Sequence, residues 1–131
     1  SILPEGAIER ARARAVALAI ACEIHPVQNL KVLNRLRREA GFDDAGVAAW
    51  ARETNAEGLA ACEALVADRP GGFLFAGRPT IAEICLVPQL GNARRFGVDV
   101  ARFPRLLAAE AAALALPAFA EAAPERQPDA E

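Results

Sequence analysis

The single histidine of the chain, His25, stands in a short segment that also carries two amide side chains. Pro26 follows it directly, and Gln28 and Asn29 lie three and four residues after His25. In a helix, this spacing puts the three polar side chains on one side. An imidazole there can bind a ligand or carry a proton, although a lone histidine more often hydrogen-bonds within its own fold. The residues alone leave both interpretations open.

Cys22 lies one helical turn before His25, and this pair raises two further kinds of chemistry. A tetrahedral zinc site needs more ligands, and neither a second histidine nor a nearby second cysteine supplies them. A cysteine and histidine can also form a nucleophile pair, but a cysteine on the apolar stripe of a helix is usually an inert core residue. We therefore expect no metal site.

A second candidate group, Asn92, Arg94 and Arg95, falls at the end of a predicted helix. A cation in the last turn complements the negative end of the helix, and solvent-exposed arginine is ordinary. The residue types alone favour this surface role.

The elements that position these side chains are predicted to be helices. The chain has 131 residues, of which 53% are hydrophobic, which is enough for one domain with its own core. Alanine and leucine dominate, whereas tyrosine is absent and strand-favouring residues are few. We expect an all-α fold, with one helical domain at residues 1–124 and a polar tail at residues 125–131.

The first predicted helix covers residues 5–22, where apolar side chains recur at a heptad-like spacing along one side. They are Ile8, Ala11, Ala15, Leu18 and Cys22. Pro26 should kink this helix rather than stop it, because the apolar pattern resumes at once and continues to Ala40. Gly41 then permits a left-handed cap, so the prediction is one bent rod.

A third helix is predicted from a cap at Asp43 or Asp44 through Leu65, with a stop at residues 69–72. Six residues recur in it at helical spacing, namely Val47, Trp50, Thr54, Gly58, Ala61 and Leu65. Gly58 costs about 1 kcal/mol relative to alanine inside a helix. We therefore expect another element to pack closely against Gly58.

The sharpest local signal starts at Thr80, whose hydroxyl can cap the amide of Glu83 while the Glu83 carboxylate reaches back to the amide of Thr80. The helix that begins there is predicted to bend at Pro88 and to end at Gly97. Two later prolines suit the first turns of two further helices, Pro104 and Pro117.

Charge and composition argue against several functional classes. A formal net charge of -2 and a pI near 5.5 are not those of a protein that holds nucleic acid. The charge-free runs are shorter than the roughly 20 residues that span a bilayer, so no membrane partner is expected. Three cysteines without paired spacing fit reduced thiols and the cytoplasm. A chain that starts at Ser1 without methionine is expected to be a fragment or a processed product.

Four ordered segments of the sequence resemble one known family. They are Cys-Glu-Ile-His-Pro-Val-Gln-Asn-Leu at 22–30, Pro-Thr-Ile-Ala-Glu-Ile-Cys-Leu-Val-Pro-Gln at 79–89, Asn-Ala-Arg-Arg-Phe-Gly-Val-Asp at 92–99 and Gln-Pro-Asp at 127–129. In this order they are similar to the C-terminal half of the zeta-class glutathione transferases, the maleylacetoacetate and maleylpyruvate isomerases. Glu83 stands where that family more often has aspartate, and either carboxylate keeps the capping role. The resemblance implies a helical bundle of the glutathione transferase C-terminal type.

The resemblance also implies a cofactor, a reaction and site residues. Glutathione would be held by a thioredoxin-like N-terminal domain, where a serine stabilises its thiolate, and that domain is absent from this sequence. By similarity, His25, Asn29, Leu30 and Lys31 would reach glutathione, and Arg95 would meet a substrate carboxylate. The reaction is a metal-free cis-trans isomerisation in the catabolism of aromatic compounds and aromatic amino acids. No catalytic residue is expected in this chain, which alone would be inactive.

Two functional hypotheses follow from these observations. The first is the substrate-side half of a glutathione-dependent isomerase that works as a homodimer on a small dicarboxylate, either maleylacetoacetate or maleylpyruvate. The second is a non-catalytic helical protein-interaction module of the same fold. Under the first hypothesis, the first helix and the segment near His25 should expose apolar surface where the missing domain packs.

Overall fold

The computed structural model describes residues 1–130, and within them every regular element is helical. The α-helices are α1 (Ala7–Leu18), α2 (Leu30–Ala40), α3 (Asp44–Leu65), α4 (Ile81–Arg95), α5 (Pro104–Leu114) and α6 (Pro117–Glu121). Four short helical turns connect or extend them, namely η1 (Ala19–Ile24), η2 (His25–Val27), η3 (Val100–Arg102) and η4 (Pro124–Arg126). The prediction of an all-α fold is confirmed.

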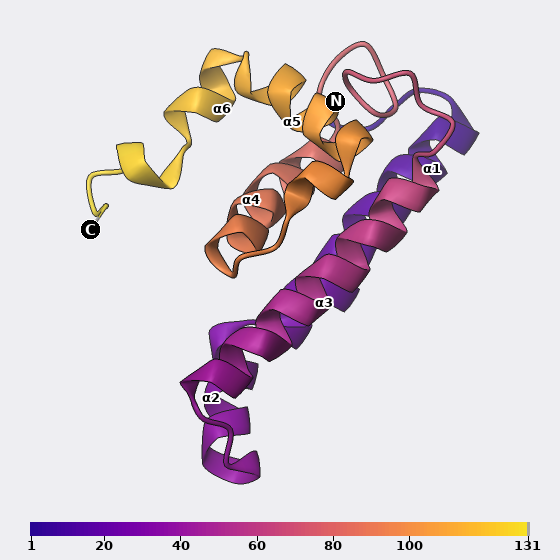
Figure 1. Cartoon of the computed structure of the whole chain (residues 1–131). Coiled ribbons are helices and arrows are strands. Elements are labelled where there is room, and N and C mark those ends of the chain that lie inside the picture. Colours follow the sequence, from indigo (N-terminus) through magenta and orange to yellow (C-terminus); the bar gives the residue numbers. More distant parts are fainter. Residues whose placement is uncertain (131) are drawn as a thin grey trace.

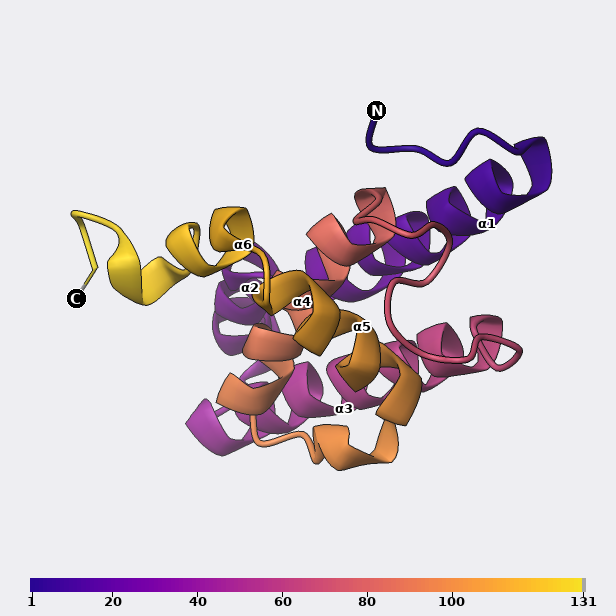
Figure 2. The ribbon, with the colours of Figure 1, turned by 90° about the horizontal axis from the view of Figure 1, so that it is seen from above.

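The helices pack as a bundle around α4. α1 and η1 both contact α4, η1 also packs against α3, and α5 lies against α4 and α3. Figures 1 and 2 show α6 leading away from this bundle to the C-terminus. Residues 125–130 of the predicted polar tail are exposed, and Glu131 lies outside the described residues.

The predicted bent rod is two helices, so the expectation of a kink without a stop at Pro26 is wrong. Before the proline, the helix widens into the π-type turn η1, and the amide of His25 donates to the carbonyl of Ile20, five residues back. The chain then leaves the helical conformation at Asn29, which has a ψ of 164°. Pro26 lacks an amide and clashes with an α-helical carbonyl, and the wider turn absorbs this clash.

Asn29 begins the second helix as its N-cap, because its side-chain oxygen accepts a hydrogen bond from the amide of Val32 at 3.1 Å. α2 ends at Gly41, whose φ of +69° is the left-handed conformation that glycine adopts without strain. Asp43 caps α3 through the amide of Gly46 at 2.8 Å. The end of α2 at Gly41 and a cap of α3 at Asp43 or Asp44 were predicted, whereas the start of α2 at Asn29 was not.

Buried apolar side chains form a large core and a smaller one. The large core joins α1, η1, α3, α4 and α5, and its side chains include Val16, Ile20, Ile24, Leu59, Leu74, Leu86, Leu90 and Leu106. The smaller core joins α2 to α3 through Leu33, Val47 and Ala51, and Phe96 packs against it. α3 therefore contributes side chains to both cores.

The apolar stripe predicted for the first helix does not face the core. Ala13, Val16, Ala17 and Ile20 are buried, whereas Ile8 is 75% exposed and Leu18 is 55% exposed. Ala11, Ala15 and Cys22 of the predicted stripe are exposed as well. The first helix therefore has two apolar sides, and the predicted side remains free.

The predicted capping box at the start of α4 is present and is connected to the preceding loop. The Glu83 carboxylate accepts hydrogen bonds from the amide and the hydroxyl of Thr80, both at 2.8 Å, and from the amide of Leu74 at 2.7 Å. Glu83 and Thr80 are fully buried. Because buried carboxylates need hydrogen-bond partners, this box also fixes the loop that carries Leu74.

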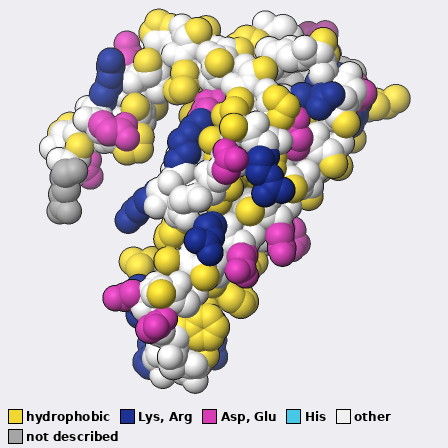
Figure 3. All heavy atoms as spheres, viewed as in Figure 1, with side chains coloured by type: hydrophobic (Ala, Val, Ile, Leu, Met, Phe, Trp, Pro, Cys, Tyr) yellow, Lys and Arg dark blue, Asp and Glu magenta, His cyan; other side chains and the backbone are white. Residues whose placement is uncertain are grey.

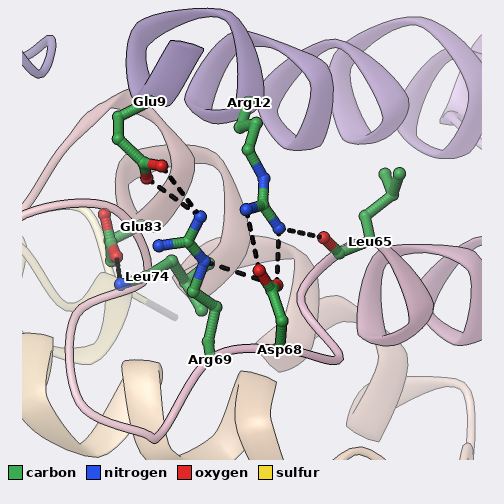
Figure 4. A network of polar contacts seen from close by, with 7 residues as sticks. All are labelled: Glu9, Arg12, Leu65, Asp68, Arg69, Leu74 and Glu83. Carbon is green, nitrogen blue, oxygen red and sulfur yellow. Dashed lines mark hydrogen bonds and ion pairs between the residues drawn. The ribbon is translucent and has the colours of Figure 1, made fainter. Parts of the chain in front are cut away.

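Charged side chains fasten the same loop to α1 (Figure 4). Arg12 of α1 pairs with Asp68 at 2.6 Å, and Arg69 pairs with Glu9 of α1 at 2.9 Å. The guanidinium of Arg12 lowers the pKa of Asp68 to about 2. Both guanidinium groups lie over the ring of Phe75, at 5.8 and 5.0 Å from its centre.

One glutamate of α3 supplies the N-terminal cap of α5. Glu63 accepts hydrogen bonds from the backbone amides of Arg105 and Leu106, each at 3.1 Å. Pro104 occupies the first position of α5, as predicted, where its missing amide costs nothing. The cap of α5 therefore comes from a residue about forty positions earlier in the chain.

By length and composition, the stretch Ala7–Ala40 is long and apolar enough to cross a membrane. Its most apolar window has a mean hydropathy of 1.2, and 33% of that window is buried. The structure breaks this stretch at Asn29 and packs its Val16 and Ile20 into the core. Core helices and signal sequences meet the same test, so the stretch alone assigns no membrane role.

Candidate functional site

The predicted glutathione-binding residues lie together at the break between η1 and α2. His25 and Lys31 are exposed, and Leu30 is 70% exposed although it is apolar. Asn29 is half-buried and uses its side-chain oxygen as the cap of α2, and among residues 1–130 its NH₂ group has no hydrogen-bond partner. The residues are thus grouped by an interrupted helix and not, as predicted, by one continuous helical face.

Gln28, in the same segment, is nearly buried, with 3% of the residue exposed. No polar atom of Gln28 is among the buried side-chain atoms that lack a hydrogen-bond partner in the described chain. Its side chain therefore gives no indication of a missing ligand at the break beside His25 and Asn29.

The segment rests on α3 at two points. The indole of Trp50 donates a hydrogen bond to the carbonyl of Val27 at 2.9 Å. Ile24 packs directly over Gly58, where a Cβ atom would lie 2.3 Å from its Cγ1 atom. The close approach predicted at Gly58 is confirmed, and the approaching group is the Ile24 side chain.

An open depression of about 520 Å³ lies between these two contacts. It is lined by Glu23, Val27, Trp50, Glu53, Thr54, Glu57 and Gly58. Within residues 1–130, no group of three or more histidine, cysteine or acidic side chains is arranged to hold a metal ion. The depression is therefore acidic without forming a cation site.

The two adjacent arginines at the end of α4 have different environments. Arg94 pairs with Glu110 of α5 through two hydrogen bonds, at 2.7 and 2.5 Å, and these bonds raise the pKa of the Arg94 guanidinium. The side chain of Glu110 is only 9% exposed. Arg94 lies at the surface, as predicted, but it also neutralises a nearly buried carboxylate.

Arg95 is exposed and makes no ion pair or side-chain hydrogen bond with any residue of the described chain. Its guanidinium therefore keeps all five N–H donors for a ligand. The next residue, Phe96, packs against the smaller core with Leu33 of α2. The end of α4 therefore lies at the same end of the molecule as α2, whose start carries Leu30 and Lys31.

Sequence reasoning missed a buried amide network between α3 and α4. Asn55 of α3 donates to Asn92 at 3.0 Å and accepts from Gln89 at 2.6 Å, and both partners belong to α4. Asn55 is fully buried and Gln89 nearly so. The available signal was an asparagine four residues after the buried Ala51 in an alanine-rich helix. The network fixes α4 on α3 just before Arg94 and Arg95.

Two of the three cysteines are thiols of low reactivity. Burial raises the pKa of the Cys62 thiol to about 11, and it also raises the pKa of Cys85. Raised pKa values keep these thiols protonated and unreactive at neutral pH. Cys22 is exposed, contrary to the expectation that it lies on a buried stripe.

The fold and these residues agree with a known class of protein. The family model for the glutathione S-transferase C-terminal domain matches residues 6–112. The chain therefore belongs to the glutathione S-transferase C-terminal domain family.

Particular relatives define the similarity more closely. The chain is 43% identical over 131 residues to a maleylpyruvate isomerase of a Ralstonia species, and this match covers 98% of the chain and 62% of the relative. It is also 43% identical to the maleylacetoacetate isomerase of Pseudomonas aeruginosa, in a match that covers 98% of the chain and 59% of the relative. The chain thus spans about three fifths of the length of these curated relatives.

Two solved structures are similar along the whole chain. One is a holo maleylpyruvate isomerase, described as a bacterial glutathione transferase of the zeta class, with a TM-score of 0.95 at 42% identity. The match covers 100% of this chain and 63% of that chain. A maleylacetoacetate isomerase of Anaeromyxobacter dehalogenans with bound glutathione gives a TM-score of 0.92 at 43% identity, and the match covers 100% of this chain and 59% of that one.

On the face seen in Figure 3, positively and negatively charged side chains are interspersed. This face therefore has no large region of a single charge sign.

Proposed function

We propose that this chain is the helical, substrate-side half of a glutathione-dependent cis-trans isomerase that acts on maleylacetoacetate or maleylpyruvate. A thioredoxin-like domain would complete the cleft and the protein would act as a cytoplasmic homodimer. The exposed Ile8, Leu18 and Leu30 offer apolar surface for such partners. The names of the relatives support this assignment, and the free Arg95 is the observation in this chain that carries it.

Arg95 would bind the carboxylate of the substrate. Its neighbour Arg94 is already paired with Glu110, so only Arg95 presents an uncommitted guanidinium at the end of α4. A planar guanidinium can pair with a carboxylate through two hydrogen bonds and so orient a flexible dicarboxylate. The chemical requirement of the proposed substrate matches the free group.

The segment at the helix break would bind glutathione. Glutathione carries two carboxylates and several amides, and the segment offers cationic Lys31, His25 and the free NH₂ group of Asn29. Exposed Leu30 adds apolar contact. When bound, glutathione would supply the thiolate that adds to the double bond, allows rotation about the resulting single bond and is then expelled. The residues of this chain would bind and orient the reactants.

The test is steady-state kinetics of the full-length protein carrying Arg95→Ala. Loss of a charge-assisted hydrogen bond should lower kcat/KM for both maleyl substrates about ten- to a hundredfold. Arg95→Lys should recover only part of this loss, because an ammonium group lacks the bidentate geometry. Arg52→Ala, which removes another exposed arginine without an ion pair in the described chain, is the matched control. Equal kcat/KM in Arg95→Ala and the control would refute the assignment.

A further inference from the structure

The helix break needs support from outside itself. Pro26 has no amide, and the chain is neither α-helical nor extended in a regular way between His25 and the cap at Asn29. Backbone carbonyls at such an interruption lack the partner that an unbroken helix provides. The carbonyl of Val27 obtains its partner from another helix, because Trp50 of α3 donates its indole N–H to it.

The second support is steric. Ile24 is 1% exposed and occupies the space that a side chain at position 58 would fill. A Cβ atom on Gly58 would come within 2.3 Å of Cγ1 and 2.6 Å of Cδ1 of Ile24, which are distances that real contacts do not reach. Only glycine at this position allows η1 to lie so close to α3.

The two supports hold the segment on both sides of His25. Trp50 and Gly58 are eight residues apart on α3, which corresponds to about 12 Å along the helix. Their partners, Val27 and Ile24, are three residues apart and enclose His25. One contact is a directional hydrogen bond and the other a close packing contact, so together they restrict both rotation and translation of the segment.

We propose that Trp50 and Gly58 are positioning residues that set where the segment of His25 and Asn29 stands relative to bound glutathione. This inference rests on the proposed function of that segment. Neither residue has to touch glutathione. Since the substrate-binding Arg95 lies on α4, displacing the segment should weaken glutathione binding and leave turnover at saturating glutathione unchanged. A purely structural role would instead lower the active fraction, and thus kcat, at constant KM.

The experiment measures KM for glutathione and kcat in the full-length protein. Trp50→Phe keeps an aromatic ring beside Phe42 but removes the N–H donor, and should raise KM about three- to tenfold. Gly58→Ala should raise KM by at least as much. Ile24→Ala removes the two clashing carbon atoms, so adding it to Gly58→Ala should recover part of the lost affinity. All variants should keep kcat within about twofold of the wild-type value.

Gly91→Ala is the matched control for the glycine substitution. Gly91 also lies inside a helix, but a Cβ atom there meets nothing within 4 Å in the described chain. Its KM for glutathione should equal that of the wild type. Circular dichroism of each variant checks that the fold is intact, and Trp50→Phe carries the test if Gly58→Ala does not fold.

The outcomes separate this inference from the proposed function. If His25→Ala raises KM for glutathione but Trp50→Phe and Gly58→Ala do not, the positioning role is refuted and the binding role stands. If His25→Ala and Asn29→Ala also leave KM unchanged, the proposed glutathione site itself fails. If Trp50→Phe lowers kcat at constant KM, the residue is structural only and the inference is again overturned.

Discussion

Replacing Arg94 with alanine should destabilise the protein, although the side chain lies partly at the surface. The substitution leaves the Glu110 carboxylate, with a side chain only 9% exposed, without its two hydrogen bonds. Breaking a fully buried ion pair costs about 3–5 kcal/mol, whereas an exposed pair contributes about 0–1 kcal/mol. Because Arg94 itself is 43% exposed, water can partly replace it. We therefore expect a loss of about 2–3 kcal/mol.

Urea denaturation of the purified chain, followed by circular dichroism and by the fluorescence of its single tryptophan, measures this loss. On heating, the melting temperature of Arg94→Ala should be lower than that of the wild type by on the order of 10 °C. Arg95→Ala is the control, since removal of an unpaired exposed side chain should change stability by less than about 0.5 kcal/mol. The double variant Arg94→Ala with Glu110→Ala should lose less than the sum of the single losses. An Arg94→Ala variant as stable as Arg95→Ala would refute the reasoning.

Two further predictions concern stability. Asn55→Ala removes the partner of the buried Gln89 amide and of the half-buried Asn92 amide, and should cost about 2–3 kcal/mol in urea denaturation. Asn34→Ala, at an exposed site, should cost less than about 0.5 kcal/mol. The pKa of Asp68 in the folded protein is about 2, below the usual 3.8, because Arg12 pairs with its carboxylate. This pairing therefore stabilises the fold above about pH 4, and the stabilisation is lost as the pH falls towards 2. Asp68→Asn should therefore lose less melting temperature between pH 4 and pH 2 than the wild type, and equal losses would contradict this pairing.

The features predicted well from the sequence depend on local chemistry. The capping box of Thr80 and Glu83 needs residues three positions apart, and Gly41 and Gly97 end helices because both adopt a positive φ. Pro104 and Pro117 start helices for a reason that lies within a single turn. Such signals do not depend on the rest of the fold, so they can be found without it.

The side of each helix that faces the core was not predictable in the same way. In α1 and η1, both Ile8 with Leu18 and Val16 with Ile20 form apolar stripes at helical spacing, and only the second is buried. α3 repeats the situation, since Leu65 of the predicted stripe is exposed and Asn55, off the stripe, is buried. In alanine-rich helices the apolar periodicity is weak, and tertiary contacts decide which side is covered.

The candidate site was predictable in its residues but not in its construction. Arg94 and Arg95 are identical in type, and only the position of Glu110 on a later helix distinguishes the paired arginine from the free one. Likewise, Asn29 shares a segment with His25, but its role as a cap appears only once the helix is seen to stop. Partners distant in sequence determine these roles, so no local pattern contains them.

The cap that Glu63 provides for α5 has a consequence for how the protein folds. α5 has eleven residues and no N-terminal cap of its own, and isolated helices of this length are marginal in water. Its first turn gains its hydrogen bonds only when the second half of α3 is already formed and nearby. We therefore expect α5 to become ordered late, after the chain has closed the loop between positions 63 and 105, with the docking of α5 slowed by this long-range contact.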